Sequence, residues 1–144
     1  MRPHLSIALL GLLSACTAAP GAPPTAQGGS SGSTSTVVQR GAISGQKQQI
    51  AYFIQVTPSC DSLGYAVVRV VTPPAHGRLS TEQGQDYPAY NKDNIRFACD
   101  AKKVPATLLF YTSDPGYAGV DSATVEAVFA DGGLMRRDYT ISVK

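Results

Sequence analysis

Apolar side chains recur at every second position in several short runs, and this period constrains the fold more than any other feature of the sequence. A two-residue period is that of a half-buried β-strand, whose side chains alternate between two faces. The runs cover residues 46–56, 64–71, 106–112, 122–130 and 136–144. Between them lie the turn formers Pro73-Pro74, His76-Gly77, Asp114-Pro115-Gly116 and Asp131-Gly132-Gly133. The pattern predicts an all-β, antiparallel β-sandwich of about seven strands.

The alternation also predicts which side chains share a face. These are Ile50, Tyr52, Ile54 and Val56 in the first run, Ala123, Val125, Ala127 and Phe129 in the fourth, and Tyr139, Ile141 and Val143 in the last. The second run, 64–71, is β-branched and nearly continuous, which indicates a central strand.

The start of the chain has the pattern of an export signal. Its apolar stretch, residues 5–13, is shorter than the roughly 20 residues that cross a bilayer as a helix, so we predict a secretory signal peptide over 1–15. The end of that stretch, Leu13-Ser14-Ala15-Cys16, resembles the bacterial lipoprotein box. The resemblance implies cleavage before Cys16 and acylation of its sulfur and its new amino group, which is enough lipid for stable anchoring. An incidental cysteine after an ordinary signal peptide is the alternative.

The lipoprotein resemblance also implies a location. Thr17, which is not an aspartate, favours the outer membrane, so we expect a bacterial envelope protein that faces the periplasm or the cell surface. Residues 16–36 carry no charge and almost no large apolar side chain, which predicts a flexible tether before a single domain over 37–144. The formal net charge of +2 gives no case for a nucleic-acid partner.

Two cysteines, Cys60 and Cys99, lie in the predicted domain. In an oxidising compartment an even pair is most simply one disulfide. A bond that closes about 40 residues contributes about 4 kcal/mol in the chain-entropy model. A metal or redox pair is the weaker alternative, because the sequence has no Cys-x-x-Cys and supplies no third ligand at suitable spacing.

The stretch from Tyr111 to Ser122, YTSDPGYAGVDS, is the most patterned of the chain. Proline presets φ, glycine accepts a positive φ, and a short acid can accept backbone N–H bonds within a turn. The stretch therefore predicts a connection between strands, with tyrosines packing the corner. Its structural residues, with one from the preceding turn, are Gly77, Pro115, Gly116, Tyr117, Gly119 and Asp121.

Together with the Pro74-to-Gly77 turn and Asp131-Gly132, this stretch resembles the bacterial immunoglobulin-like and cadherin-like repeat domains. The resemblance covers 67–143 and implies an immunoglobulin-like sandwich. Two features depart from the family: Ala123 and Val125 stand where larger aromatic residues are common, and the sequence holds one copy without an internal repeat.

Catalytic chemistry has little support in the sequence. His76 is the one histidine of the predicted domain, and its position before Gly77 favours a solvent-facing turn residue over a triad with Ser122 and an aspartate. Glu82, Asp86, Asp93 and Asp100 could supply a carboxylate pair for glycoside hydrolysis but are more simply solvated. We predict no catalytic residue and no enzyme, with an unrecognised hydrolase as the alternative.

Calcium is the better inorganic alternative, because it takes six to eight oxygen ligands. Candidate ligands lie at Tyr90–Asn94, Asp114 and Asp121, but the sequence lacks dense acidic clusters. The prediction is therefore no metal site, and no cofactor beyond the lipid on Cys16.

Residues 80–97 are long for a hairpin connection and combine tyrosines with amides and acids. Such loops on a sandwich are where binding usually resides. We predict contacts to an envelope protein or glycan through Tyr87, Tyr90, Asn91 and Asp93. The alternative is one irregular strand with its tyrosines packed inward. Lys102-Lys103 and Arg136-Arg137 are expected to be solvated. The predicted function is non-catalytic binding or envelope support, or else an inhibitor or accessory subunit of an envelope enzyme.

Overall fold

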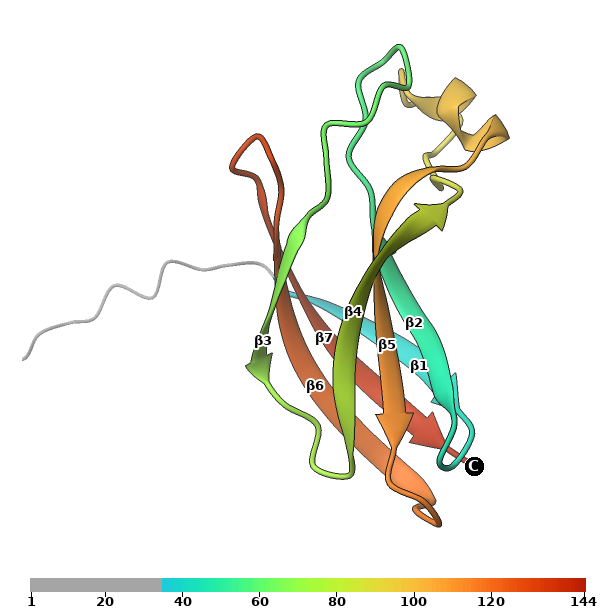
Figure 1. Cartoon of the computed structure of the whole chain (residues 1–144), viewed down its shortest axis with the longest axis vertical. Helices are drawn as coiled ribbons and strands as arrows, with labels where there is room; N and C mark the ends of the chain where they lie inside the picture. The colour runs from blue at the N-terminus through green and yellow to red at the C-terminus, as the bar shows by residue number, and fades with distance from the viewer. Residues whose placement is uncertain (1–34) are drawn as a thin grey trace, which may run out of the picture. The chain divides into compact units, whose positions relative to one another are not determined.

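The computed structural model describes residues 35–144, which fold into two packed β-sheets (Figure 1). The elements are β1 (Thr36–Ala42), β2 (Lys47–Phe53), β3 (Val67–Thr72), β4 (Gly77–Asp86), the 3₁₀ helix η1 (Phe97–Ala101), β5 (Val104–Ser113), β6 (Gly119–Val128) and β7 (Leu134–Val143). The prediction of an all-β sandwich with about seven strands is confirmed. The predicted signal peptide, Cys16 and the predicted tether up to residue 34 lie outside the described residues.

The strand order is that of an immunoglobulin-like sandwich. One sheet has the order β1-β7-β6-β3 and the other β2-β5-β4. Strands β2, β5 and β4 thus correspond to B, E and D, and β3, β6 and β7 to C, F and G. All pairs are antiparallel except β1–β7, which is parallel and departs from the predicted antiparallel sheets. The parallel pair arises because the chain changes sheets directly after β1, at a turn where Gly45 has a φ of 71°.

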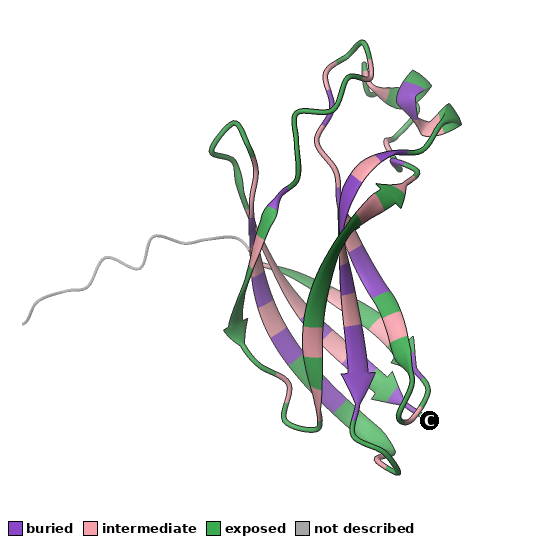
Figure 2. Ribbon diagram, in the orientation of Figure 1, coloured by how far each residue is buried: buried purple, intermediate pink, exposed green. Residues whose placement is uncertain are grey.

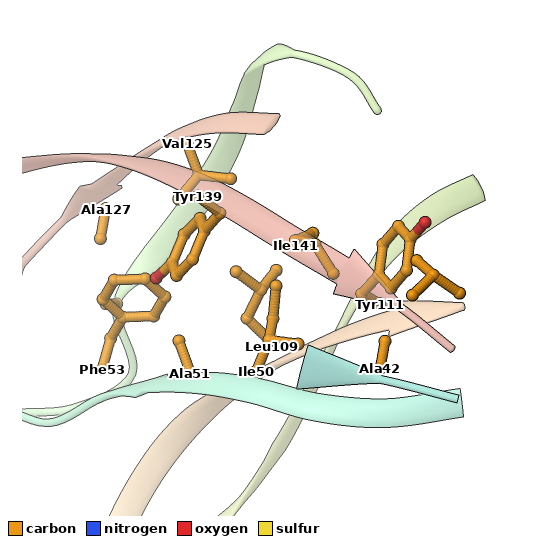
Figure 3. Packing of buried hydrophobic residues seen from close by; sticks show 12 residues of the cluster. Ala42, Ile50, Ala51, Phe53, Leu109, Tyr111, Val125, Ala127, Tyr139 and Ile141 are labelled. Atoms are coloured by element: carbon orange, nitrogen blue, oxygen red, sulfur yellow. The ribbon is translucent and has the colours of Figure 1, made fainter. Parts of the chain in front are cut away.

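The core lies between the sheets, around the central strand β5. Figure 2 shows buried residues along β5, β6 and β7, whereas β3 and β4 are largely exposed. Leu109, Tyr111, Val125, Tyr139 and Ile141 are among the most buried side chains, and Figure 3 shows how they interdigitate. The predicted inward faces of β6 and β7 are confirmed, with Phe129 just beyond β6 and only partly buried.

The predicted inward face of β2 is partly wrong. Ile50 is buried as expected, but Ala51 and Phe53 then face the core, while Tyr52 and Ile54 are half-buried. The pairing of β2 with β5 shifts register between Gln49 and Ala51. An extra residue at such a bulge exchanges the two faces of the strand that follows.

The predicted central strand is an edge strand. Among the strands of residues 35–144, β3 pairs with β6 alone, and its first residue, Val67, is 64% exposed. A segment rich in β-branched residues fits a pleated strand, but this composition does not determine how many neighbouring strands pair with that segment.

The corner from Tyr111 to Ser122 joins β5 to β6, as predicted. The Tyr117 N–H donates to the Asp114 carbonyl oxygen at 3.2 Å, and Gly116, at the third position of this turn, has a φ of 80°. Gly119 has a φ of 149°, and a Cβ added to it would lie 3.0 Å from the Tyr117 hydroxyl oxygen. That hydroxyl donates a hydrogen bond to the Val120 carbonyl oxygen. The residues predicted as structural therefore build the turn.

The Asp121 carboxylate accepts hydrogen bonds from segments outside its own turn. The buried carboxylate accepts the N–H groups of Ala75 (2.9 Å), His76 (3.0 Å) and Ser122 (2.9 Å), and the Tyr111 hydroxyl at 2.9 Å. The expectation that Asp121 accepts bonds within its own turn is thus correct for Ser122 alone. Two N–H donors come from the β3–β4 connection, so the carboxylate ties both sheets together at this end.

Gly77 is required by close approach rather than by a positive φ. A Cβ added there would lie 2.5 Å from the Thr112 carbonyl oxygen and 2.8 Å from the Tyr111 ring. Gly77 therefore lets β4 begin directly against β5.

Candidate binding site

The two connections at the other end of the sandwich, residues 54–66 and 87–103, form a second small structural unit, which we call the disulfide-tied end (Figure 1). The predicted disulfide is confirmed: it joins Cys60 in the first connection to Cys99 in η1, with Cα atoms 5.3 Å apart. Val56, Cys99 and Val104 form a satellite core here, separate from the main core. The bond and this core together hold the two connections against each other.

Hydrogen bonds fix the longer connection in place. The Asp100 carboxylate accepts the Tyr90 N–H at 2.9 and 3.2 Å. The Arg96 Nε donates to the Val56 carbonyl oxygen at 2.7 Å, across to the shorter connection. The Asn94 side chain accepts the Arg96 N–H at 2.9 Å. Residues 87–103 are therefore an ordered loop rather than a loose one.

The predicted binding segment 80–97 is wrong at its start. Residues 80–86 belong to β4, so the loop begins at Tyr87. The alternative, an irregular strand with inward tyrosines, is correct only in that residues 80–86 are a strand, because β4 pairs with β5 without a shift in register and contains no tyrosine. β4 is an edge strand with little buried surface, and its polar sequence therefore lacks the alternation that identifies a half-buried strand.

The four predicted binding residues have different environments. Tyr87, Asn91 and Asp93 are exposed, whereas Tyr90 is half-buried and packs against the satellite core. The structure thus leaves three of them at the surface and uses the fourth for packing. The Lys103 ammonium lies 5.6 Å from the centre of the Tyr87 ring.

Two surface residues of the loop escaped the sequence prediction. Ile95 is 73% exposed and Phe97 is 49% exposed, as is Tyr87. Their signal was present in the sequence as large apolar residues inside an otherwise polar segment, but without a strand register they could equally have been core residues. The loop therefore presents three large apolar side chains to solvent.

A pocket of about 490 Å³ lies beside this loop. Pro88, Ala89 and Tyr90 line it from the loop, and residues 49–54 line it from β2 and its end. Burial raises the pKa of Tyr52 in its wall, and the nearby Asp86 and Asp100 raise it further. The remaining wall consists of Arg40, Phe129, Met135 and Arg137.

Three of the groups considered for catalysis, His76, Asp86 and Asp100, have structural partners. The exposed His76 ring stacks on Tyr117 with centroids 4.1 Å apart, and it is the His76 backbone, not its ring, that binds Asp121. The Asp86 carboxylate accepts the Gln49 amide at 2.7 Å, while Asp100 holds the loop. The turn environment expected for His76 is confirmed.

The sequence also predicts solvated arginines at 136–137 and no metal site. Arg136 instead pairs with Glu126 at 3.2 Å, and Arg137 lines the pocket. Within residues 35–144 there is no group of three or more His, Cys, Asp or Glu side chains that could hold a metal ion. Both oxygens of Asp121, one of the calcium candidates, already accept hydrogen bonds from the protein.

Comparison of the chain with protein-family models, with curated proteins and with solved structures finds no match. Among residues 35–144, no helix has the length and apolar character that crossing a membrane requires. The function must therefore be inferred from the fold and from the residues of this chain.

Proposed function

We propose that this chain is a non-catalytic binding protein of the bacterial cell envelope, anchored by lipid on Cys16, whose disulfide-tied end contacts a protein partner. The observation that carries the proposal is the exposure of Tyr87, Ile95 and Phe97 on one ordered loop. Burying a side chain of this size in a contact contributes about 1.5–3 kcal/mol. Aromatic residues are also enriched at the centres of protein interfaces.

The order of the loop strengthens this proposal. The disulfide, the Asp100–Tyr90 bond and the Arg96–Val56 bond fix the backbone before any partner arrives. A loop ordered in advance loses less conformational entropy on binding, so more of the contact energy contributes to affinity. An aliphatic residue such as Ile95 at the most exposed position favours a protein partner over a glycan.

Replacing Ile95 and Phe97 together by serine is expected to lower the yield of the protein's crosslinked adducts in intact cells by about tenfold, as loss of a central apolar contact does. The free energy of unfolding should change little, because both side chains are exposed. The matched control is Val120→Ser, which removes an apolar side chain that is 65% exposed on β6 at the corner end. Equal adduct yields from all three proteins would contradict the proposed surface.

Replacing Cys16 by serine is expected to move the chain from the membrane fraction to the soluble fraction of the cell. The resemblance of residues 13–16 to the lipoprotein box supports a lipid at this position, and each acyl CH₂ that enters the bilayer contributes about 0.8 kcal/mol. Mass spectrometry of the intact protein should show the loss of the acyl chains in the variant. An unchanged mass and unchanged fractionation would contradict the anchor and leave the binding surface as a separate question.

A further inference from the structure

Two arginines point toward the space between the sheets, where apolar side chains are the rule. Arg137 shares its face of β7 with the buried Tyr139 and Ile141, because alternate residues of a strand lie on one side. Arg40 likewise shares its face of β1 with the buried Ala42. Both arginines line the pocket beside the loop. The pocket wall is therefore cationic at positions that the strand pattern assigns to the core.

Neither arginine is neutralised. Arg40 donates to two backbone carbonyl oxygens, those of Ile50 and of Gln39 (2.8 Å to the latter), and the Arg137 Nε lies 3.2 Å from the Met135 sulfur. Across residues 35–144 the ion pairs are Lys47–Glu82 and Arg136–Glu126, so no carboxylate of the described chain pairs with these two guanidinium groups. Unpaired positive charge at a partly enclosed wall favours an anionic ligand.

A buried hydroxyl beside the pocket also lacks a hydrogen-bond acceptor. Tyr139 is 1% exposed, and its O–H group donates to no acceptor within the described residues, because its polar neighbour, the Arg137 guanidinium, can only donate. Burial raises the pKa of Tyr139, whereas the charges of Arg137 and Arg40 and hydrogen bonding with Arg137 lower it. In Figure 3 the hydroxyl points toward Phe53 and Ala51, two residues of the pocket lining. An unpaired buried donor is costly unless something accepts from it.

The nearby carboxylates, Asp86 and Asp100, neither neutralise the two arginines nor accept a hydrogen bond from Tyr139. Asp86 and Asp100 are close enough to raise the pKa of Tyr52, but neither lines the pocket. Asp86 accepts the Gln49 side-chain amide and the Tyr87 N–H, and Asp100 accepts the Tyr90 N–H. Their charges are thus used to hold the strand and the loop in place.

The rest of the lining combines the polar side chains of Gln49, Tyr52 and Tyr90 with apolar side chains. Phe53 and Ile50 contribute from β2, Phe129 and Met135 from the two ends of the β6–β7 connection, and Pro88 from the loop. A volume of about 490 Å³ is in the range of small-ligand pockets. The pocket therefore combines one cationic wall with space for an apolar group.

We propose that this pocket binds a monocarboxylate that carries an aromatic or aliphatic body, with the carboxylate at Arg40 and Arg137 and the body against the partly buried Phe129 and Met135. Guanidinium groups bind carboxylates through paired charge-assisted hydrogen bonds, which fix orientation as well as charge. Such a group occurs at the C-terminal residue of a peptide and in a free aromatic acid. The inference does not rest on the proposed function, because Tyr87, Ile95 and Phe97 are not in the pocket lining.

The test is titration of the purified chain with N-acetylphenylalanine, its amide, and phenylacetate, followed by NMR. We expect saturable shifts with an acid below about 10 mM, the affinity range of a small ligand with one charged contact. The neutral amide should bind about tenfold more weakly or worse, because it loses the charge-assisted bonds. Binding of N-acetylphenylalanine supports a peptide C-terminus as the source, whereas binding of phenylacetate alone supports a free acid.

The variant Arg137→Met, which keeps most of the side-chain volume, is expected to weaken binding of the acid by about tenfold or more. Its matched control is Arg136→Met, which removes the adjacent arginine and its pair with Glu126 but not a pocket residue, and should change affinity less than twofold. The acid-to-amide comparison uses the wild-type chain and so does not depend on whether a variant folds. The proposal is overturned if no acid binds, if acid and amide bind equally, or if both arginine variants behave alike. The inward Arg40 would then serve only to keep the edge strand β1 from pairing with another strand.

Discussion

Replacing Asp121 by alanine is expected to lower the free energy of unfolding by about 3–5 kcal/mol, the largest effect of any single substitution considered for this chain. The carboxylate accepts three backbone N–H groups and the Tyr111 hydroxyl, and these donors come from three different segments. Alanine would leave the buried Tyr111 hydroxyl with one longer bond, 3.2 Å to the His76 carbonyl oxygen. A domain of this size has about 5–15 kcal/mol of stability in total, so much of it would be lost.

Urea unfolding of the two proteins measures this loss. The matched control is Asp114→Ala, an exposed aspartate in the same connection, which should change stability by less than about 0.5 kcal/mol. The remaining folded Asp121→Ala protein should keep the disulfide-tied end, which lies at the other end of the sandwich from the corner (Figure 1), and the pocket, whose lining contains no corner residue. Loss of binding with unchanged stability would instead identify Asp121 as a binding residue.

The pH dependence of stability provides a second measurement of the same group. Burial raises the pKa of the Asp121 carboxyl, but the N–H groups of Ala75, Ser122 and His76 and the Tyr111 hydroxyl outweigh it and leave the pKa below its usual range. A lowered folded-state pKa contributes stability that is complete above the unfolded value of about 3.9 and is lost as pH falls through the folded value. The Asp121→Asn variant should therefore lose less stability than wild type on acidification below about pH 4. Parallel acid profiles would contradict this account.

Replacing Cys60 and Cys99 together by alanine is expected to lower the free energy of unfolding by about 4 kcal/mol in the chain-entropy model. The bond joins residues that are 39 positions apart, so it removes many conformations from the unfolded chain. Cys99 also has no exposed surface and is part of the satellite core with Val56 and Val104. The loss should therefore be accompanied by loosening of residues 87–103.

Urea unfolding and amide hydrogen exchange together measure these two effects. Exchange should rise within 87–103 and stay low in β5, β6 and β7, which belong to the main core. The wild-type chain under reducing conditions is the matched control, because it lacks the bond but keeps both side chains. Unchanged exchange in the loop of the double variant would show that the satellite core and hydrogen bonds order the loop without the disulfide.

How far the sequence predicts this fold depends on how local the determining contacts are. The faces of β6 and β7 follow from alternation alone, because these two strands pair with each other without a shift in register. The face of β2 could not be predicted, because the bulge between Gln49 and Ala51 depends on pairing with a strand more than fifty residues away. The edge position of β3 likewise depends on which strands pair, and composition does not report that.

The candidate sites likewise contain some features that local sequence predicts and others that depend on contacts between distant segments. The disulfide and the ordered loop with Tyr87 and Tyr90 were predictable from composition and length. Hydrogen bonds to the Asp121 carboxylate were expected from within its own turn. Two of the N–H donors come instead from the β3–β4 connection, which lies next to Asp121 only in the folded chain. Arg137 had a local signal, since it stands two residues before Tyr139 and four before Ile141 on the inward face of one strand. That alternation predicts an inward charge, although it does not predict the pocket.

We propose that the disulfide-tied end, rather than the patterned corner, contacts a protein partner. The most direct measurement places a photoreactive amino acid at position 95 or at position 120 and irradiates intact cells that produce the chain. Ile95 lies on the exposed loop, and Val120 lies at the corner end with comparable exposure. We expect a discrete protein adduct from position 95 and none from position 120. The absence of any adduct at position 95, or the same adducts from both positions, would contradict the account.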